Sequence, residues 1–294
     1  MSSFSRVEIR RCRPLLGTYV ELTVEHAGDA AAHEAAGRAF AEIATVHRLM
    51  SAHDPESDLA RIQQDGLATP VEVDPRTHEV LALAARLHAE SDGVFDVTVG
   101  SELARRGLLP ALPLAEGAGR GGDVRLHSRH RVSLRRPARL DLGGIAKGYA
   151  VDRAVSVLRH CGARAGLVNA GGDLRCFGPT PRAIAVRPPD GVGLVPLPPV
   201  RDVAVATSSH VPGRGIPALD ASPHVHGGTR EPVVRAFGVT VFAPRCVLAD
   251  ALTKVVLATG RPDHPLLARH GAWALLVPAA QRATDAAQPA GPIA

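Results

Sequence analysis

The sequence predicts an α+β fold, in which a single domain combines mixed sheets with flanking helices. Short strand patterns and several amphipathic helix patterns follow one another without the regular strand–helix–strand alternation of a doubly wound sheet. Of the 294 residues, 45% are hydrophobic, which is ample for a core. Only 3% are aromatic, so alanine, valine and leucine must do most of the packing.

The first half of the chain begins with a strand followed by two helices. Residues 16–24 alternate between apolar and polar side chains, which predicts a half-buried strand. Residues 32–50 carry apolar side chains at helical spacing. Asp74 followed by Pro75 is typical of a helix start, so a second helix is expected there. The buried faces are expected to hold Val20, Leu22 and Val24, then Phe40, Ile43, His47 and Met50, then Val80, Leu83, Ala84 and Leu87.

The second half mixes one long helix with short strands and loops. Residues 105–122 are rich in Gly, Pro, Ala and Leu and predict an irregular surface loop, and 208–235 predict a long loop that could be functional. Flexible termini are expected over residues 1–11 and 281–294. Helix 145–161 is expected to turn Ala150, Ala154, Val157 and Cys161 to the core. Strands are expected at 165–169, 202–206, 238–243 and 273–277.

Composition excludes several classes of protein. The formal net charge is +5, but no lysine-rich run with interleaved aromatics occurs, so we expect no nucleic-acid partner. A positive surface would suit a polyanionic small molecule such as a dinucleotide. The four cysteines are widely spaced and predict free thiols. Without an apolar leader or a 20-residue apolar stretch, we expect a cytoplasmic protein and no membrane partner.

The most informative segment is the glycine-rich turn at residues 140–152. An extended stretch containing Asp141 runs through Gly143 and Gly144 directly into an amphipathic helix. Glycines let the backbone approach a ligand, and the free N–H groups of a helix start suit a phosphate. Turns of this kind also occur in proteins without a ligand. Two further segments, at 93–98 and at 169–173, strengthen the prediction that this turn binds a ligand.

Together these segments resemble the ApbE family of FAD:protein FMN transferases, in the family's order over residues 12–260. Seven ordered matches are far more specific than any one of them. The resemblance implies one ApbE-like domain over residues 12–280. It also implies transfer of FMN from the substrate FAD to a Thr or Ser hydroxyl of an acceptor flavoprotein, with release of AMP. The matching segments are residues 13–18, 50–59, 93–98, 140–152, 169–173, 206–208 and 249–252.

The resemblance also implies a Mg²⁺ site, because the attacked phosphorus is shielded by negative oxygens. Asp250 matches the family's metal-binding aspartate, with a backbone carbonyl near Gly144 as a further ligand. The family's threonine at the i+4 position is Lys254 here, and Thr253 stands at i+3. Thr253 could still reach the metal, the Lys254 ammonium could take the metal's place, or Asp250 and Lys254 could form a surface pair.

A second departure lies in the loop at residues 223–232. Aligning Thr229 with the family's threonine puts His226 where the family has an aspartate. His224 remains the candidate catalytic base for the acceptor hydroxyl, since a neutral imidazole can accept its proton. A solvated loop histidine is the alternative.

The resemblance implies a set of flavin-nucleotide contacts as well. For the acidic residues the alternative is turn capping, and for Lys147 a solvated position. Lys254 and the altered loop also favour a second hypothesis, a flavin-binding or assembly protein without transfer activity. A nicotinamide oxidoreductase ranks last, because no complete GxGxxG motif is present. The expected contacts are Leu16, His53, Val94, Phe95, Asp96, Asp141, Lys147, Thr207 and Ser208.

Overall fold

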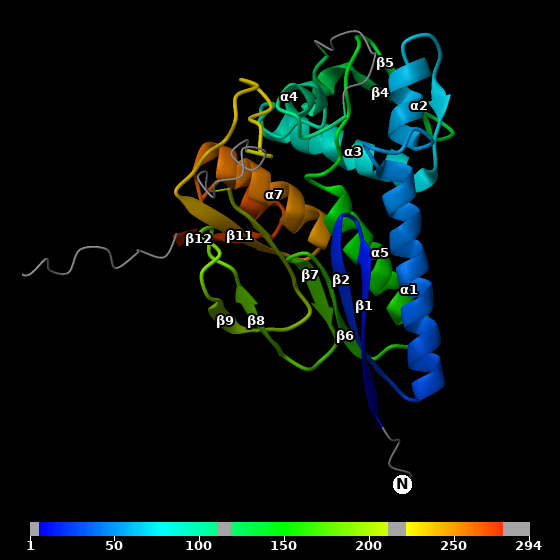
Figure 1. Cartoon of the computed structure of the whole chain (residues 1–294), viewed down its shortest axis with the longest axis vertical. Coiled ribbons are helices and arrows are strands. Elements are labelled where there is room, and N and C mark those ends of the chain that lie inside the picture. The colour runs from blue at the N-terminus through cyan, green and yellow to red at the C-terminus, as the bar shows by residue number, and fades with distance from the viewer. Residues whose placement is uncertain (1–5, 111–118, 211–221, 279–294) are drawn as a thin grey trace, which may run out of the picture.

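The structure is a computed structural model that describes residues 6–110, 119–210 and 222–278. Its centre is a seven-stranded sheet with the strand order β1-β2-β6-β7-β10-β11-β12 (Figure 1). Every neighbouring pair in this sheet is antiparallel. The strands are β1 (Val7–Leu15), β2 (Thr18–His26), β6 (Ala165–Ala170), β7 (Asp173–Phe177), β10 (Ala204–Ser208), β11 (Phe237–Ala243) and β12 (Trp273–Pro278).

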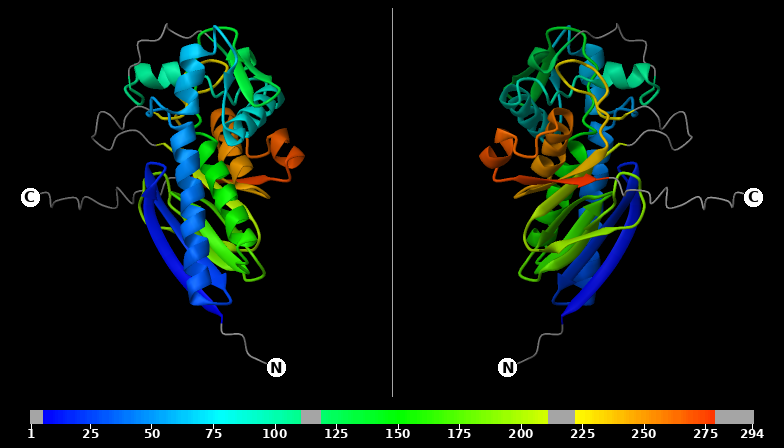
Figure 2. Two further views of the ribbon diagram at one scale, coloured as in Figure 1. Left: turned by 90° about the vertical axis from the view of Figure 1, so that its right-hand side faces the viewer. Right: turned by 90° about the vertical axis from the view of Figure 1, so that its left-hand side faces the viewer.

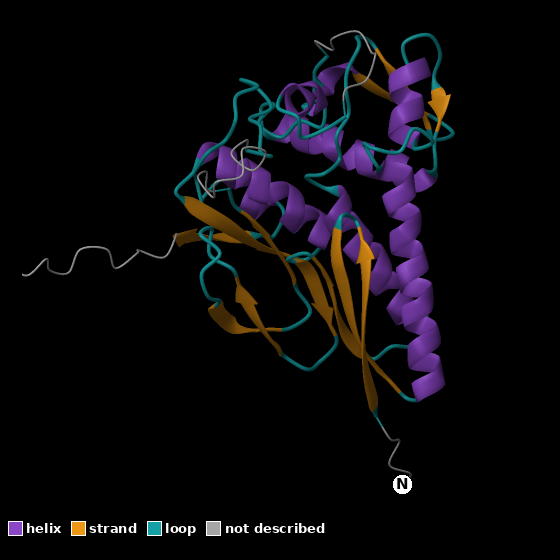
Figure 3. Ribbon diagram, viewed as in Figure 1, coloured by secondary structure: helices purple, strands orange, loops and turns teal. Residues whose placement is uncertain are grey.

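Three long helices pack against one face of this sheet (Figure 3). They are α1 (Asp29–Met50), α5 (Ala146–His160) and α7 (Cys246–Thr259). Alternate residues of β2, such as Val20 and Leu22, are buried against them. The opposite face is covered by the hairpin of β8 (Arg182–Val186) and β9 (Val195–Val200). There Ile184 packs with Val205 and Phe242.

A smaller group of elements lies at one end of α1, beyond the large sheet (Figure 2). A three-stranded sheet with the order β3-β5-β4 belongs to it. Its apolar side chains, such as Leu59 and Val132, join the same cluster as those of the large sheet. The elements of this group are α2 (Asp58–Asp65), β3 (Val71–Glu72), α3 (Pro75–Glu90), α4 (Gly100–Arg105), the 3₁₀ turn η1 (Gly121–Asp123), β4 (Val124–His127) and β5 (Arg131–Leu134). The short helix α8 (Pro265–Arg269) packs beside β12 of the large sheet.

The predicted α+β class is confirmed, and the predicted strands and long helices are present within a few residues. One correction concerns the N-terminus, where regular structure starts at Val7 and pairs with His26. The expected flexible segment 1–11 is therefore wrong for residues 7–11. The error arose because β1 is an edge strand with charged, exposed side chains, a pattern that resembles a solvated tail. Residues 281–294 lie outside the described part of the chain.

Two core assignments also need correction. His47 is exposed on α1, and Val46 and Leu49 are buried in its place. On α5, Val157 and Cys161 are only half-buried, because Leu158 and Val155 face the core. Within 105–122, α4 ends at Arg105 and η1 adds a short turn, while 111–118 lie outside the described residues.

Candidate functional site

The candidate site lies where the first turn of α5 meets α7. Asp141 precedes the glycine turn, and its Oδ1 accepts a hydrogen bond of 3.2 Å from the Gly143 N–H. The side chains of Leu142 and Ile145 are buried in the core and hold the turn in place. Burial raises the pKa of Asp141, while the Gly143 N–H and the charges of His53 and Lys254 oppose that rise. The turn therefore presents a partly desolvated carboxyl group and two glycines to the site.

Two aspartates fix how α5 and α7 cross. Asp152 on α5 accepts hydrogen bonds of 3.0 Å from the N–H groups of Cys246 and Val247, which begin α7. In return, Asp250 on α7 accepts one of 3.0 Å from the N–H of Gly148, in the first turn of α5. Each helix thus receives a carboxylate at its N-terminus, where the helix dipole favours negative charge.

Asp250 also binds the ammonium group of Lys254, one helical turn later. Its side chain is completely buried. Burial alone would raise the pKa of Asp250, but the charges of Lys254 and Lys147 and the Gly148 N–H outweigh burial and lower it. Asp250 is therefore held as a carboxylate, with Oδ1 on Lys254 and Oδ2 on Gly148.

A second ion pair stands beside the first. Lys147, on the first turn of α5, binds Asp173 at the start of β7. Burial lowers the pKa of Lys147, but the carboxylates of Asp173 and Asp250 have the larger combined effect and raise it. Burial and the nearby Asp250 charge raise the pKa of Asp173. The two lysines and two aspartates therefore form one cluster of charged side chains next to the glycine turn.

The predicted Mg²⁺ ligands do not fit a metal ion in this arrangement. Both carboxylate oxygens of Asp250 are occupied, one of them by the Lys254 ammonium. The Thr253 hydroxyl donates to the Asp250 carbonyl at 2.7 Å and pairs with Ser208 at 2.7 Å. A Cβ placed on Gly144 would lie 3.4 Å from Cε of Lys254, so the lysine stem runs over the turn. Within the described ranges, no cluster of three or more His, Cys, Asp or Glu side chains could hold a metal.

His224 faces the same cluster from the loop that follows residue 221. Its carbonyl accepts a hydrogen bond of 2.8 Å from the Val233 N–H, which closes the loop into a narrow hairpin. Burial lowers the pKa of His224 to about 3, and the nearby charges of Lys254, His210 and Lys147 contribute. The imidazole is therefore neutral at physiological pH and lies within electrostatic range of both lysines.

His226, which the resemblance aligns with an aspartate of the family, accepts hydrogen bonds within the turn as an aspartate side chain can. Its Nδ1 accepts hydrogen bonds from the N–H groups of Gly228 at 3.1 Å and Thr229 at 3.2 Å. An aspartate oxygen commonly accepts such bonds from the residues two and three positions later. The departure in this loop therefore preserves the turn.

Asp96, a predicted nucleotide contact, has both carboxylate oxygens bound within the protein. Oδ1 accepts from the Thr98 N–H at 2.8 Å and hydroxyl at 2.7 Å. Oδ2 accepts from the Gly121 N–H at 3.1 Å and from Arg230 at 2.9 Å. The bonds to Thr98 are those of the turn-capping alternative, and the bonds to Gly121 and Arg230 tie the loop to distant segments. The loop at 93–98 contacts the segment that runs from His224 to Val233, here called the His224 loop, since the Gly227 N–H donates to the Val94 carbonyl at 3.0 Å.

The predicted pair Thr207 and Ser208 divides between the two faces of β10. Ser208 faces α7 and bonds Thr253, whereas Thr207 faces the other side and bonds Thr240 at 2.9 Å. The side chain of Thr207 therefore points away from the cluster, because successive residues of a strand alternate. Only Ser208 can present its side chain to the site.

The remaining predicted contacts lie around the rim. Leu16 has a positive φ of 56° at the tip of the β1–β2 hairpin. The neighbouring Thr18 reaches the turn before Asp173, since a Cβ on Gly171 would lie 2.6 Å from its hydroxyl oxygen. His53 is exposed but close enough for its charge to affect the pKa of Asp141. Phe95 is buried in the core cluster, so it supports its loop from within.

Sequence reasoning missed two members of the site. Asp173 ends the matching segment 169–173, but its partner Lys147 lies 26 positions earlier, and nothing in either segment indicates the pairing. Arg230 was also missed; it has a positive φ of 65° and binds the buried Asp96 from the His224 loop. The sequence feature that could have indicated Asp173 is its position directly after Gly171 and Gly172, because the first residue after such a turn lies at the end of a strand.

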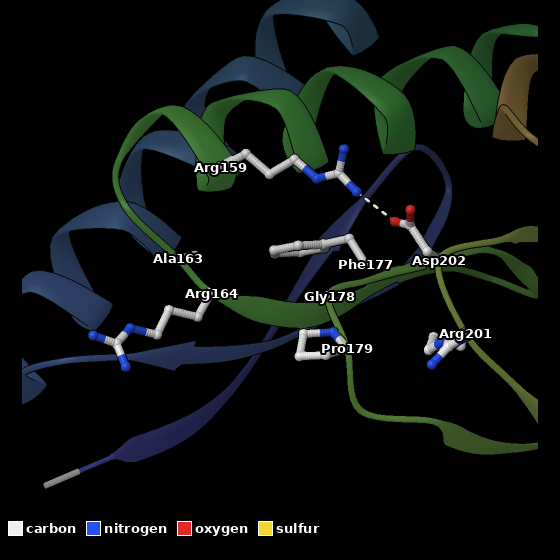
Figure 4. A pocket seen from close by; sticks show the side chains of 8 residues that line it. All are labelled: Arg159, Ala163, Arg164, Phe177, Gly178, Pro179, Arg201 and Asp202. Atoms are coloured by element: carbon white, nitrogen blue, oxygen red, sulfur yellow. Dashed lines mark hydrogen bonds and ion pairs between the residues drawn. The ribbon is translucent and has the colours of Figure 1, made fainter. Parts of the chain in front are cut away.

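A separate pocket of about 420 Å³ lies at the C-terminal end of α5 (Figure 4). That end is roughly 20 Å along the helix from Lys147, at 1.5 Å per residue. Arg159 there pairs with Asp202 and lies over the ring of Phe177. None of the predicted site residues lines this pocket, so the cluster at the start of α5 remains the candidate site.

Comparisons with known proteins point to one family. A family model described as "ApbE family" matches residues 16–276. Over 273 residues, the chain is 27% identical to a protein from Rhodobacter capsulatus named FAD:protein FMN transferase, which covers 86% of this chain and 52% of that protein. The aligned part thus spans about half the length of that relative. A Treponema pallidum protein of the same name is also 27% identical, over 86% of this chain and 79% of that protein.

Solved structures show the same fold. The apo form of a Pseudomonas stutzeri flavinyl transferase ApbE superposes with a TM-score of 0.77 at 23% identity, covering 94% of this chain and 92% of that one. The ApbE protein of Thermotoga maritima gives a TM-score of 0.74 at 26% identity, covering 93% and 94%. No helix among the described residues combines the length and the hydropathy needed to cross a bilayer.

Proposed function

Because the chain belongs to the ApbE family, we propose that it is a FAD:protein FMN transferase. The proposed reaction moves FMN from FAD to a Thr or Ser hydroxyl of a target flavoprotein and releases AMP. The observation that carries the proposal is that two lysines, Lys147 bound to Asp173 and Lys254 bound to Asp250, stand beside the glycine turn at the start of α5. Two ammonium groups suit a pyrophosphate, because charge-assisted hydrogen bonds to phosphate oxygens are strong.

The reaction needs one bond to form and one to break. The acceptor hydroxyl oxygen attacks the FMN phosphorus, the anhydride bond to the AMP phosphate breaks, and AMP leaves with that bridging oxygen. Positive charge from Lys147 and Lys254 would balance the charge that develops on the phosphate oxygens. The hydroxyl proton passes to His224, which is neutral in the free protein.

A base with a pKa near 3 is weak, and its environment in the complex matters. The Lys254 charge is one of the causes that lower the pKa of His224. A bound pyrophosphate would neutralise that charge and so raise the pKa of His224 toward the range in which imidazole accepts a proton well. His224 is therefore proposed as the catalytic base of the FAD complex.

A flavin-binding or assembly protein without transfer activity is the second candidate. Lys254 favours it, because a single ammonium charge stabilises a developing phosphate charge less than a divalent cation would. The two candidates separate in one assay, in which the protein is incubated with FAD and a purified acceptor flavoprotein and the denatured acceptor is examined for covalent flavin fluorescence. Its control is the same acceptor with the target hydroxyl removed. Fluorescence only on the intact acceptor supports transfer, and its absence with saturating FAD supports the second candidate.

We propose a cytoplasmic location, supported by four free cysteines at positions 12, 161, 176 and 246. Reaction of these thiols in protein extracted under thiol-trapping conditions tests the proposal. Disulfide-linked forms in fresh extracts would count against it.

A further inference from the structure

Lys147 and Lys254 are the only two lysines in the chain. The sequence holds 34 lysine and arginine residues, and every one of the others is arginine. Both lysines stand in the candidate site, and each ammonium group contacts a buried aspartate. The chain therefore uses the compact ammonium group at these two places alone, and the broader guanidinium group everywhere else.

The surroundings explain why an ammonium group fits here. The Lys254 stem passes over Gly144, and even a single Cβ at that glycine would approach Cε to 3.4 Å. A guanidinium group is wide, planar and rigid, whereas an ammonium group is a compact charge with three donors that can turn. Lys254 has one donor on Asp250 and is 19% exposed, so its other donors can meet an incoming oxygen. Lys147 is 32% exposed and is placed similarly on Asp173.

The same contacts leave no place for a divalent cation. Mg²⁺ requires near-octahedral coordination by oxygen. At Asp250 one oxygen is bound to Lys254 and the other to the Gly148 N–H. The Thr253 hydroxyl is turned to Ser208 and to the Asp250 carbonyl. A cation at Asp250 would have to displace the Lys254 ammonium from the carboxylate. The cation and that ammonium would then be two positive charges close together without a carboxylate between them.

We propose that the Lys254 ammonium takes the place of a divalent cation, and that Lys147 and Lys254 together bind the pyrophosphate of FAD without Mg²⁺. The proposal rests on the proposed function for the identity of the ligand. Each ammonium keeps its aspartate contact and donates its free N–H groups to phosphate oxygens. The glycine turn lies beside both, so its backbone can approach the same oxygens.

The two-lysine composition provides a direct test. Protein labelled with ¹³C at lysine Cε gives two side-chain signals, which Lys254→Arg assigns by removing one. In EDTA, added FAD is expected to shift both signals, and Mg²⁺ added alone is expected to shift neither. Binding measured by calorimetry should give the same Kd in EDTA and in excess Mg²⁺. A requirement for Mg²⁺, or a FAD complex in which the Lys254 signal does not move, would overturn the proposal.

Lys254→Thr supplies the reciprocal test, since it places a hydroxyl four residues after Asp250. We expect this variant to lose at least tenfold in FAD affinity in EDTA and to recover part of it in Mg²⁺. Mn²⁺ binding without FAD, followed by electron paramagnetic resonance, should be weak in the wild type and stronger in the variant. Arg261→Thr removes an exposed charge just beyond α7 and should change neither Kd nor Mn²⁺ binding.

Two further outcomes are informative. Lys254→Met keeps the apolar stem and keeps the test valid if the threonine variant misfolds; its FAD affinity should fall and should not recover in Mg²⁺. If no condition gives FAD binding, the proposed function and the FAD part of this proposal both fail. The Mn²⁺ comparison then decides by itself whether Lys254 excludes a cation, and equal Mn²⁺ binding by wild type and variant would refute that.

Discussion

Replacing Gly148 by alanine tests how closely α5 and α7 must cross to build the site. A Cβ on Gly148 would lie 2.3 Å from the Cys246 carbonyl oxygen and 2.8 Å from Cβ of Asp250. Neither neighbour is the end of a flexible side chain, so the helices must separate. The separation would also stretch the hydrogen bond from the Gly148 N–H to Asp250.

The size of the effect follows from three contributions. Overpacking costs roughly 1–3 kcal/mol, and losing a hydrogen bond to a buried carboxylate costs about 1.5–3 kcal/mol. The better helix propensity of alanine offsets about 1 kcal/mol. We therefore expect Gly148→Ala to lower the free energy of unfolding by roughly 1.5–5 kcal/mol, and to weaken FAD binding because Asp250 and Lys254 move.

The matched control is the same substitution in another helix interior. Gly37 lies in α1, and a Cβ there would meet nothing within 4 Å. Gly37→Ala is expected to raise the free energy of unfolding by roughly 0.5–1 kcal/mol. Urea unfolding of both variants beside the wild type measures the difference. A Gly148→Ala protein as stable as the wild type, with unchanged FAD affinity, would refute the account of the crossing.

Three other predictions concern side chains around the site. Because His224 has a folded-state pKa of about 3 and an unfolded value near 6.5, its contribution to stability is complete above pH 6.5 and is lost as the pH falls toward 3; His224→Asn should flatten that dependence, which approaches about 1.4 kcal/mol per pH unit, and identical unfolding profiles would contradict it. His226→Asp should retain wild-type stability, while His226→Ala should lose about 1 kcal/mol by thermal unfolding, and equal losses would disprove the capping role. Asp96→Asn should lower the free energy of unfolding by about 3 kcal/mol because it breaks the buried pair with Arg230, and a loss of FAD affinity without a loss of stability would instead indicate direct nucleotide contact.

Local patterns predicted the fold well where one face of an element is buried. The alternation in β2 and the helical stripe of α3 both matched the buried residues, because the period of the element fixes which side chains point inward. His47 lies near the apolar stripe of α1, but its ring faces solvent while Val46 packs inward. The 3.6-residue period leaves such borderline positions to tertiary packing.

The site was harder to predict, because its contacts join distant segments. Lys147 and Asp173 belong to different elements, and only the pairing of α5 with β7 brings them together. Lys254 could be flagged from its i+4 spacing to Asp250, but spacing alone could not say whether the pair is exposed or buried. Thr207 and Ser208 matched one motif, yet the strand that carries them sends the two side chains to opposite faces.

The most direct test of the central claim is the molar ratio of AMP released to FMN attached to a purified acceptor flavoprotein. The reaction should contain FAD and Mg²⁺, so that the result does not depend on how Lys254 acts. We predict a ratio near one, with both products reduced together in His224→Asn. FAD that binds tightly but yields neither AMP nor covalent flavin would contradict the account and indicate a flavin-binding protein.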